Sequence, residues 1–146
     1  MNTIRSADGT AIAYTQAGQG PPLVLVDGAL CSRSFGPMPK LAAQLTPHFT
    51  VYTYDRRGRG ASGDTKPYAV DREVEDIEAL AALAGGTVLV HGTSSGSALA
   101  LEAARRIPAI GKLAVYEPPF IVDNSRTPIP DDYLARLGER DGGSVG

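Results

Sequence analysis

Cysteine is nearly absent from this sequence. Cys31 is the only one among 146 residues, so no disulfide can form within the chain. That composition fits a reducing compartment. Residues 1–6 lack the apolar stretch of a signal peptide, and no apolar run approaches the length that spans a bilayer. We therefore expect a cytoplasmic protein with no membrane partner.

Charge of one sign is also lacking. The formal net charge is −2, which gives no reason to expect nucleic acid as a partner. No group of His, Cys and carboxylate residues has the spacing of a metal site, so no metal is expected. With 42% hydrophobic residues, the chain suits one domain with a sizeable core.

Short apolar or β-branched runs alternate along the chain with segments of helical spacing. The expected strands are 3–6, 11–17, 23–26, 50–54, 87–91 and 112–116, and the expected helices are 39–45, 71–84 and 95–106. A proline-rich loop over 118–130 and the start of one more helix over 131–140 follow. Helix 95–106 is small and apolar almost all round, so we expect it to be buried. The alternation predicts an α/β fold, with a mostly parallel sheet and helices on both faces.

The strongest chemical signal is Gly92-Thr93-Ser94-Ser95-Gly96, which lies between a β-branched strand and a helix of small residues. This strand–turn–helix context is typical of a nucleophile elbow, whereas the bare pentapeptide could be a turn without chemistry. Gly92 and Gly96 lack the Cβ atoms that would clash in so tight a turn. Ser94 is then held on a strained turn. The N–H of Ser95 lies at a helix N-terminus, which favours a developing negative charge.

Four segments, in this order, resemble the N-terminal part of the α/β-hydrolase fold superfamily, and the resemblance runs from about Thr3 to about Tyr133. They are 20–29, similar to the strand that leads into the oxyanion loop; 54–62, similar to an Asp-x-Arg-Gly-x-Gly-x-Ser turn; the elbow 92–96; and 114–119, similar to the strand that precedes the cap. The resemblance implies a core over residues 1–117 and the start of a cap over residues 118–146. The last strands of the fold and most of the cap would be missing.

The resemblance implies a serine hydrolase that needs no cofactor and acts on a small-molecule acyl substrate. Ser94 would attack a carbonyl, and the N–H groups of Ser95 and Ala29 would form the oxyanion hole. Asp27 and Thr93 depart from the pattern, because relatives often have His at both places. Carboxylic esters, thioesters, lactones and carbon–carbon bonds next to a ketone are all open as substrates. The alternative is a non-catalytic binding protein or receptor on the same fold.

In this superfamily a catalytic acid and then a His follow the nucleophile. His48 and His91 both precede Ser94, so we interpret both as structural. Some relatives have the acid after the strand 112–116, so Glu117 is the candidate, with Asp123 in the next loop as the second choice. Other relatives have the acid one strand later, which would lie beyond Gly146. Glu117 could instead only anchor the cap.

The arginine-rich turn 55–62 is interpreted as structural, with Arg57 paired to Asp55 or to carbonyl groups, because it lacks the Gly-Lys-Ser pattern of a phosphate loop. Cys31 is interpreted as a small packing residue. No histidine follows Ser94, so the chain alone is expected to be inactive. The strand 112–116 is interior in the superfamily. Here its edge would be exposed, and the chain could self-associate through it.

Overall fold

The computed structural model describes residues 1–133, 135 and 136. Six strands and three helices follow one another along the chain. They are β1 (Asn2–Arg5), β2 (Ala11–Ala17), β3 (Pro22–Val26), α1 (Met38–Leu45), β4 (Thr50–Tyr54), α2 (Val70–Ala84), β5 (Val88–Thr93), α3 (Ser95–Arg106) and β6 (Ile110–Tyr116). The helix expected over 131–140 lies largely outside the described residues.

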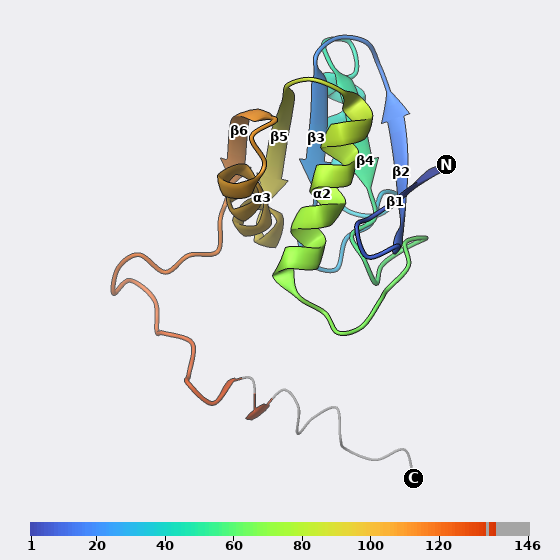
Figure 1. Ribbon diagram of the computed structural model, residues 1–146. Helices are drawn as coiled ribbons and strands as arrows, with labels where there is room; N and C mark the ends of the chain where they lie inside the picture. Colours follow the sequence, from blue (N-terminus) through green and yellow to red (C-terminus); the bar gives the residue numbers. More distant parts are fainter. Residues whose placement is uncertain (134, 137–146) are drawn as a thin grey trace.

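All six strands form one sheet with the order β1-β2-β4-β3-β5-β6. The pairs β3–β4, β3–β5 and β5–β6 are parallel, so the carboxyl ends of these four strands meet at one edge (Figure 1). The hairpin strand β1 pairs antiparallel with β2, and β2 pairs antiparallel with β4. The sheet is therefore mostly parallel, as the alternation of strands and helices predicted.

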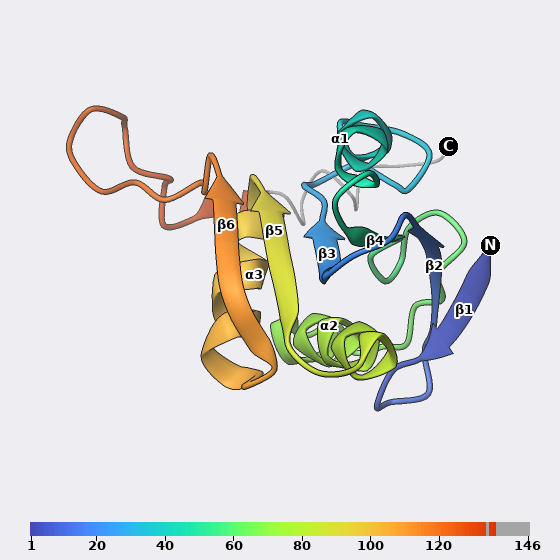
Figure 2. The ribbon, with the colours of Figure 1, turned by 90° about the horizontal axis from the view of Figure 1, so that it is seen from above.

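Helices cover both faces of the sheet. Figure 2 shows α1 on one side and α2 on the other, and α3 packs beside α2. The side chains of β3 alternate accordingly: Val24 and Val26 join the core under α2 and α3, whereas Leu23 and Leu25 join the smaller core under α1. The apolar run of β3 is thus buried on both faces.

One expectation about the elements needs correction. Helix α3 is buried along one face only, because Leu101 is 39% exposed while Leu99 and Ala103 are buried. Glu102, Arg105 and Arg106 also lie on its outer side, where they pair with one another. The small residues of α3 serve the close contact with the sheet; they do not mean that the helix is surrounded by protein.

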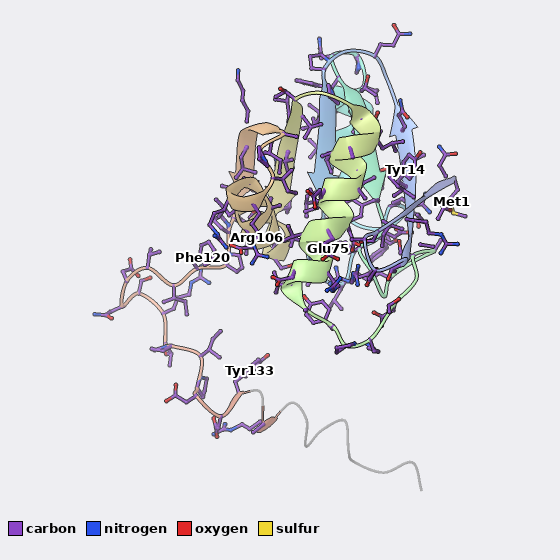
Figure 3. All side chains as sticks on the ribbon, viewed as in Figure 1. Met1, Tyr14, Glu75, Arg106, Phe120 and Tyr133 are labelled. Carbon is purple, nitrogen blue, oxygen red and sulfur yellow. The ribbon has the colours of Figure 1, made fainter. Side chains whose placement is uncertain are left out.

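The segment after β6 extends away from the sheet in Figure 1. Its described residues are exposed apart from Pro118, and Tyr133 is seen on it at a distance from the core (Figure 3). The division between a core over residues 1–117 and the start of a cap over residues 118–146 stays a prediction.

Candidate active site at the carboxyl edge of the sheet

Ser94 occupies the turn between β5 and α3 in a conformation that L residues rarely adopt, with φ 53° and ψ −123°. Two glycines make this turn possible. A Cβ on Gly92 would lie 2.5 Å from the carbonyl oxygen of Gly96, and one on Gly96 would lie 2.3 Å from the carbonyl oxygen of Val26. The turn therefore has the strand–turn–helix geometry that the pentapeptide predicted.

Hydrogen bonds to β6 hold the turn in place. The N–H of Ser94 donates to the carbonyl of Tyr116 at 2.9 Å. The buried hydroxyl of Ser97 donates to the carbonyl oxygens of Gly92 at 2.8 Å and of Tyr116 at 2.9 Å. These hydrogen bonds hold the strained backbone of Ser94, and such strain persists only where the surrounding structure fixes it.

The loop after β3 lies against the Ser94 side chain. A Cβ on Gly28 would be 3.4 Å from the Cβ and 4.0 Å from the Oγ of Ser94. Ala29 follows directly. Neither its N–H nor that of Ser95, at the first turn of α3, donates a hydrogen bond to any described residue. Both N–H groups are therefore left without a partner among the described residues, and their role as an oxyanion hole for Ser94 stays a prediction.

Three residues other than glycine have a positive φ among the described residues, and each follows the carboxyl end of a parallel strand. Leu30 (φ 60°) follows β3, Ser94 follows β5, and Glu117 (φ 50°) follows β6. Ligands of open α/β sheets bind at this edge, and strained residues cluster at functional sites. The backbone strain and the sequence motif therefore indicate the same edge.

Glu117 is distant from this turn along the chain but lies next to it in the fold, since the carbonyl of its neighbour Tyr116 accepts the hydrogen bond from Ser94. The Glu117 side chain is exposed, and no described residue donates a hydrogen bond to its carboxylate. Asp123 is also exposed, and accepts a hydrogen bond from the N–H of Ser125 at 2.9 Å, which together with the Ser125 side chain lowers the pKa of its carboxyl. The assignment of the acid to Glu117, with Asp123 second, stays a prediction.

The two histidines occupy different places. His48 precedes β4 and therefore lies at the amino edge of the parallel strands. The five residues of β4 span about 16 Å, so His48 is about that far from the carboxyl edge. His91 lies on β5, where its Nε2 is 3.1 Å from the Oγ1 of Thr93. Burial lowers the pKa of His91 and so favours its neutral form. These positions agree with structural roles for both residues.

Asp27, which departs from the superfamily pattern, has an unusual environment in the structure. Its side chain is buried, one carboxylate oxygen accepts the N–H of Gly28 at 2.8 Å, and the other has no hydrogen-bond partner among the described residues. Burial raises the pKa of this carboxyl. Nearby, burial and the Asp27 carboxylate raise the pKa of the Cys31 thiol, which does not suit a nucleophilic role for Cys31.

The arginine-rich turn after β4 is bound to carboxylates, but not in the way expected. Arg57 pairs with Asp76 of α2 at 2.7 Å and with Asp8 at 2.8 Å, whereas Asp55 pairs with Arg33 at 3.1 Å. The pairing of Arg57 with Asp55 was therefore wrong. The partners of Arg57 come from distant segments of the chain, and the Asp55 carboxylate is occupied by Arg33.

Two further arginines of this turn reach the loop beside Ser94, which the sequence analysis missed. Arg56 donates to the carbonyl of Asp27 at 3.2 Å, and Arg59 donates to the carbonyl of Gly28 at 2.8 Å. No local signal could have found these contacts, because about thirty residues separate the partners. The described residues include no group of three His, Cys or carboxylate side chains that could hold a metal ion.

Comparison with known proteins agrees with this architecture. The model of the alpha/beta hydrolase family matches residues 17–144, and the chain belongs to that family. It is similar to an alpha/beta hydrolase from Sphaerobacter thermophilus, with 54% identity and a TM-score of 0.90 over 97% of this chain and 54% of the other.

Two sequence relatives are an acyltransferase and an esterase by name. Ethanol acetyltransferase 1 of Cyberlindnera fabianii is 34% identical over 115 residues, which are 77% of this chain and 32% of that protein. Pimeloyl-[acyl-carrier protein] methyl ester esterase of Xanthomonas campestris pv. campestris is 39% identical over 100 residues, which are 67% of this chain and 37% of that protein. The chain thus spans about a third of the length of these relatives. Among the described residues, no helix combines the length and apolar character needed to cross a membrane.

Proposed function

We propose that the whole protein is a serine hydrolase that cleaves a carboxylic ester or a related small acyl substrate, with Ser94 as the nucleophile. The observation that carries the proposal is the strained backbone of Ser94 beside two unused N–H donors, those of Ser95 and Ala29. Relatives named as an esterase and an acyltransferase support acyl chemistry. The proposed substrates are small molecules, and the reaction needs no cofactor.

In the proposed reaction, the Oγ of Ser94 forms a bond to the substrate carbonyl carbon and gives its proton to a general base. The carbonyl oxygen becomes an oxyanion, which accepts hydrogen bonds from the N–H groups of Ser95 and Ala29. The bond to the leaving alcohol then breaks, and the base returns its proton to that alcohol. Water cleaves the acyl-enzyme in the same way. The superfamily order implies a histidine base after Ser94, with Glu117 as the acid that orients it.

The proposal is tested by Ser94→Ala in the whole protein, with hydrolysis of nitrophenyl butyrate as the measurement. Without the nucleophile, kcat should fall by several orders of magnitude, with an unchanged thermal melting curve. A fluorophosphonate probe should label the parent protein at Ser94 and leave the variant unlabelled. Thr3→Ala removes an exposed hydroxyl from β1, across the sheet, and is the matched control that should keep both signals.

Unchanged turnover in Ser94→Ala would contradict the proposal. A folded whole protein with neither turnover nor labelling would support the non-catalytic binding protein instead.

A second candidate function is acyl transfer to an alcohol, which the similarity to ethanol acetyltransferase 1 favours. The same acyl-enzyme would be attacked by an alcohol oxygen in place of water. Adding ethanol to the nitrophenyl butyrate assay and measuring ethyl butyrate distinguishes the two. Hydrolysis alone yields butyrate at every ethanol concentration.

A further inference from the structure

The loop that carries Ala29 is held by guanidinium groups. Arg59 binds it at the carbonyl oxygen of the peptide unit that also contains the Ala29 N–H. Arg59 donates to the carbonyl oxygen of Gly28 at 2.8 Å. That carbonyl belongs to the same peptide unit as the N–H of Ala29. The only cis peptide among the described residues is Lys66–Pro67, so the Gly28–Ala29 peptide is trans. In a trans peptide the C=O and the N–H point in opposite directions. Fixing the Gly28 carbonyl therefore fixes the direction of the Ala29 N–H.

The remaining bonds of the loop leave this peptide little freedom. Oδ1 of Asp27 accepts the N–H of Gly28 at 2.8 Å, and Arg56 donates to the carbonyl of Asp27 at 3.2 Å. Arg56 also donates to the hydroxyl of Ser95 at 3.1 Å, which ties the loop to the first residue of α3. Both candidate oxyanion donors are thus attached to one framework of arginine bonds. The loop is held without any bond that uses the Ala29 N–H.

The positive charge of Arg59 acts on the Gly28–Ala29 peptide and is not used in an ion pair with a described carboxylate. Arg33, Arg56 and Arg57 each pair with a carboxylate, whereas no described carboxylate forms an ion pair with Arg59. A cationic donor on a carbonyl gives a strong hydrogen bond and polarises the amide, so the N–H on its other side becomes a better donor. A positive charge near a developing oxyanion favours the transition state over the ground state.

We propose that Arg59 is a positioning residue of the Ser94 reaction, which holds and polarises the Gly28–Ala29 peptide so that the Ala29 N–H faces the oxyanion. This inference rests on the proposed function. Arg59 does not touch the substrate in this scheme. It acts through the peptide that it binds, so its loss should weaken the transition state and leave ground-state binding almost unchanged.

The test uses Arg59→Gln and Arg59→Lys in the whole protein, with kcat expressed per site titrated by a fluorophosphonate. For Arg59→Gln we expect kcat for nitrophenyl butyrate to fall about 10- to 100-fold, which is less than the loss of an oxyanion donor itself, with KM within about twofold. Affinity for a trifluoromethyl ketone, which forms a tetrahedral adduct, should fall in parallel. Arg59→Lys keeps the positive charge and should recover part of both losses.

A matched control is Arg72→Gln, which removes a surface arginine of α2 that pairs with Glu75. It should change neither kcat nor the affinity for the ketone. A purely structural role for Arg59 would lower the melting temperature and the fraction of titratable sites but leave kcat per site unchanged. That result would overturn the inference.

A crystal structure of the Arg59→Gln protein provides a readout that does not depend on turnover. We expect the Gly28–Ala29 peptide to rotate or to adopt two orientations. A single unchanged orientation would overturn the inference even if the parent enzyme is active. Conversely, absent Ser94-dependent turnover in the parent would overturn the proposed function, while the orientation of this peptide would still show whether Arg59 holds it.

Discussion

At the scale of single residues, Asp27 is a buried carboxyl on which the burial effect exceeds the opposing effects of the Gly28 N–H, Arg56 and Arg59. It is 3% exposed, forms no ion pair with a described residue, and leaves one carboxylate oxygen without a hydrogen bond. Burial disfavours the ionised carboxyl, so its pKa is raised in the folded protein. Asp55 shows the contrast: burial acts on it in the same direction, but hydrogen bonds from Ala61 and Arg33 outweigh burial and lower its pKa.

The raised pKa of Asp27 predicts a pH-dependent effect of Asp27→Asn on stability. The folded state keeps the Asp27 proton to a higher pH than the unfolded state, whose pKa is about 3.9. The parent protein therefore loses stability as pH rises from the unfolded pKa through the folded one, and Asn removes this loss. The free energy of unfolding of the variant should match that of the parent below about pH 4 and exceed it at pH 7. Urea unfolding of the whole protein across this range is the measurement.

The hydrogen bond to the Gly28 N–H is kept in Asp27→Asn, because the amide oxygen can accept it. A difference between variant and parent that does not vary with pH would contradict the assignment of a raised pKa. Asp131→Asn, on the exposed segment after β6, is the matched control and should show no such dependence on pH.

At the scale of elements, Arg57 joins three segments that are far apart in the sequence. Its side chain is fully buried and binds Asp76 of α2 and Asp8 of the β1–β2 turn. These ion pairs raise the pKa of the Arg57 guanidinium and lower that of the Asp8 carboxyl. The turn after β4 is thereby fixed to the helix that covers the sheet and to the hairpin at its far edge.

Removing one partner of this buried pair should cost far more than removing both. Arg57→Met leaves the Asp76 carboxylate buried and without its cation, which costs about 3–5 kcal/mol of the free energy of unfolding. The double variant Arg57→Met with Asp76→Leu should be more stable than the sum of the two single effects predicts. Urea unfolding of the four proteins measures the coupling, and additive effects would show that the pair contributes nothing specific.

The sequence predicts elements better than it predicts the contacts between them. Strand β4 and helix α3 have the bounds that local patterns indicate, because a β-branched run and a nucleophile turn are contiguous signals. Strand β5 extends further, to Thr93, and β6 begins earlier, at Ile110, because pairing with neighbouring strands decides where they end. Propensity alone contains no information about such partners.

In the candidate site, too, the sequence predicts the local turn but not the contacts between distant segments. Ser94, Ser95 and the two glycines lie within five residues, so spacing and backbone sterics indicate the turn. The arginine contacts to residues 27 and 28 join chain segments 29 and 31 residues apart, and only the fold brings them together. Asp27 could be noticed as a departure from the superfamily pattern, but its burial and its unpaired oxygen are properties of the folded protein.

At the scale of the whole molecule, the β6 side of the sheet presents apolar surface. Val115 and Tyr116 are 41% and 59% exposed. A groove with a volume of about 420 Å³ lies between α1 and the sheet, and it is lined mainly by apolar residues, among them Leu41, Phe49 and Leu113. The described residues pair one side of β6 with β5 and leave its other side as an edge. Unpaired edges with apolar neighbours promote association.

The 146-residue chain alone is therefore expected to associate through this edge. Light scattering after gel filtration should show dimers or larger species whose proportion grows with concentration. Val115→Lys places a charge on the exposed edge strand and should shift the population toward monomer. Thr3→Lys, at the opposite edge of the sheet, is the matched control and should leave the distribution unchanged. A parent chain that stays monomeric at every concentration would contradict this prediction.

The 146-residue chain alone is expected to be catalytically inactive, because the order of its residues provides no histidine base for Ser94. No histidine follows Ser94, His48 lies at the wrong edge of the sheet, and His91 is bonded to Thr93 on β5. A monomeric, folded preparation should not hydrolyse a nitrophenyl ester measurably, since a serine hydroxyl without a general base is a weak nucleophile. A chimera that joins residues 1–146 to the part of the Sphaerobacter thermophilus hydrolase beyond this similarity should gain Ser94-dependent turnover. Turnover by the 146-residue chain that disappears in Ser94→Ala would instead mean that one of its own histidines acts as the base, and His91→Gln and His48→Gln would show which one.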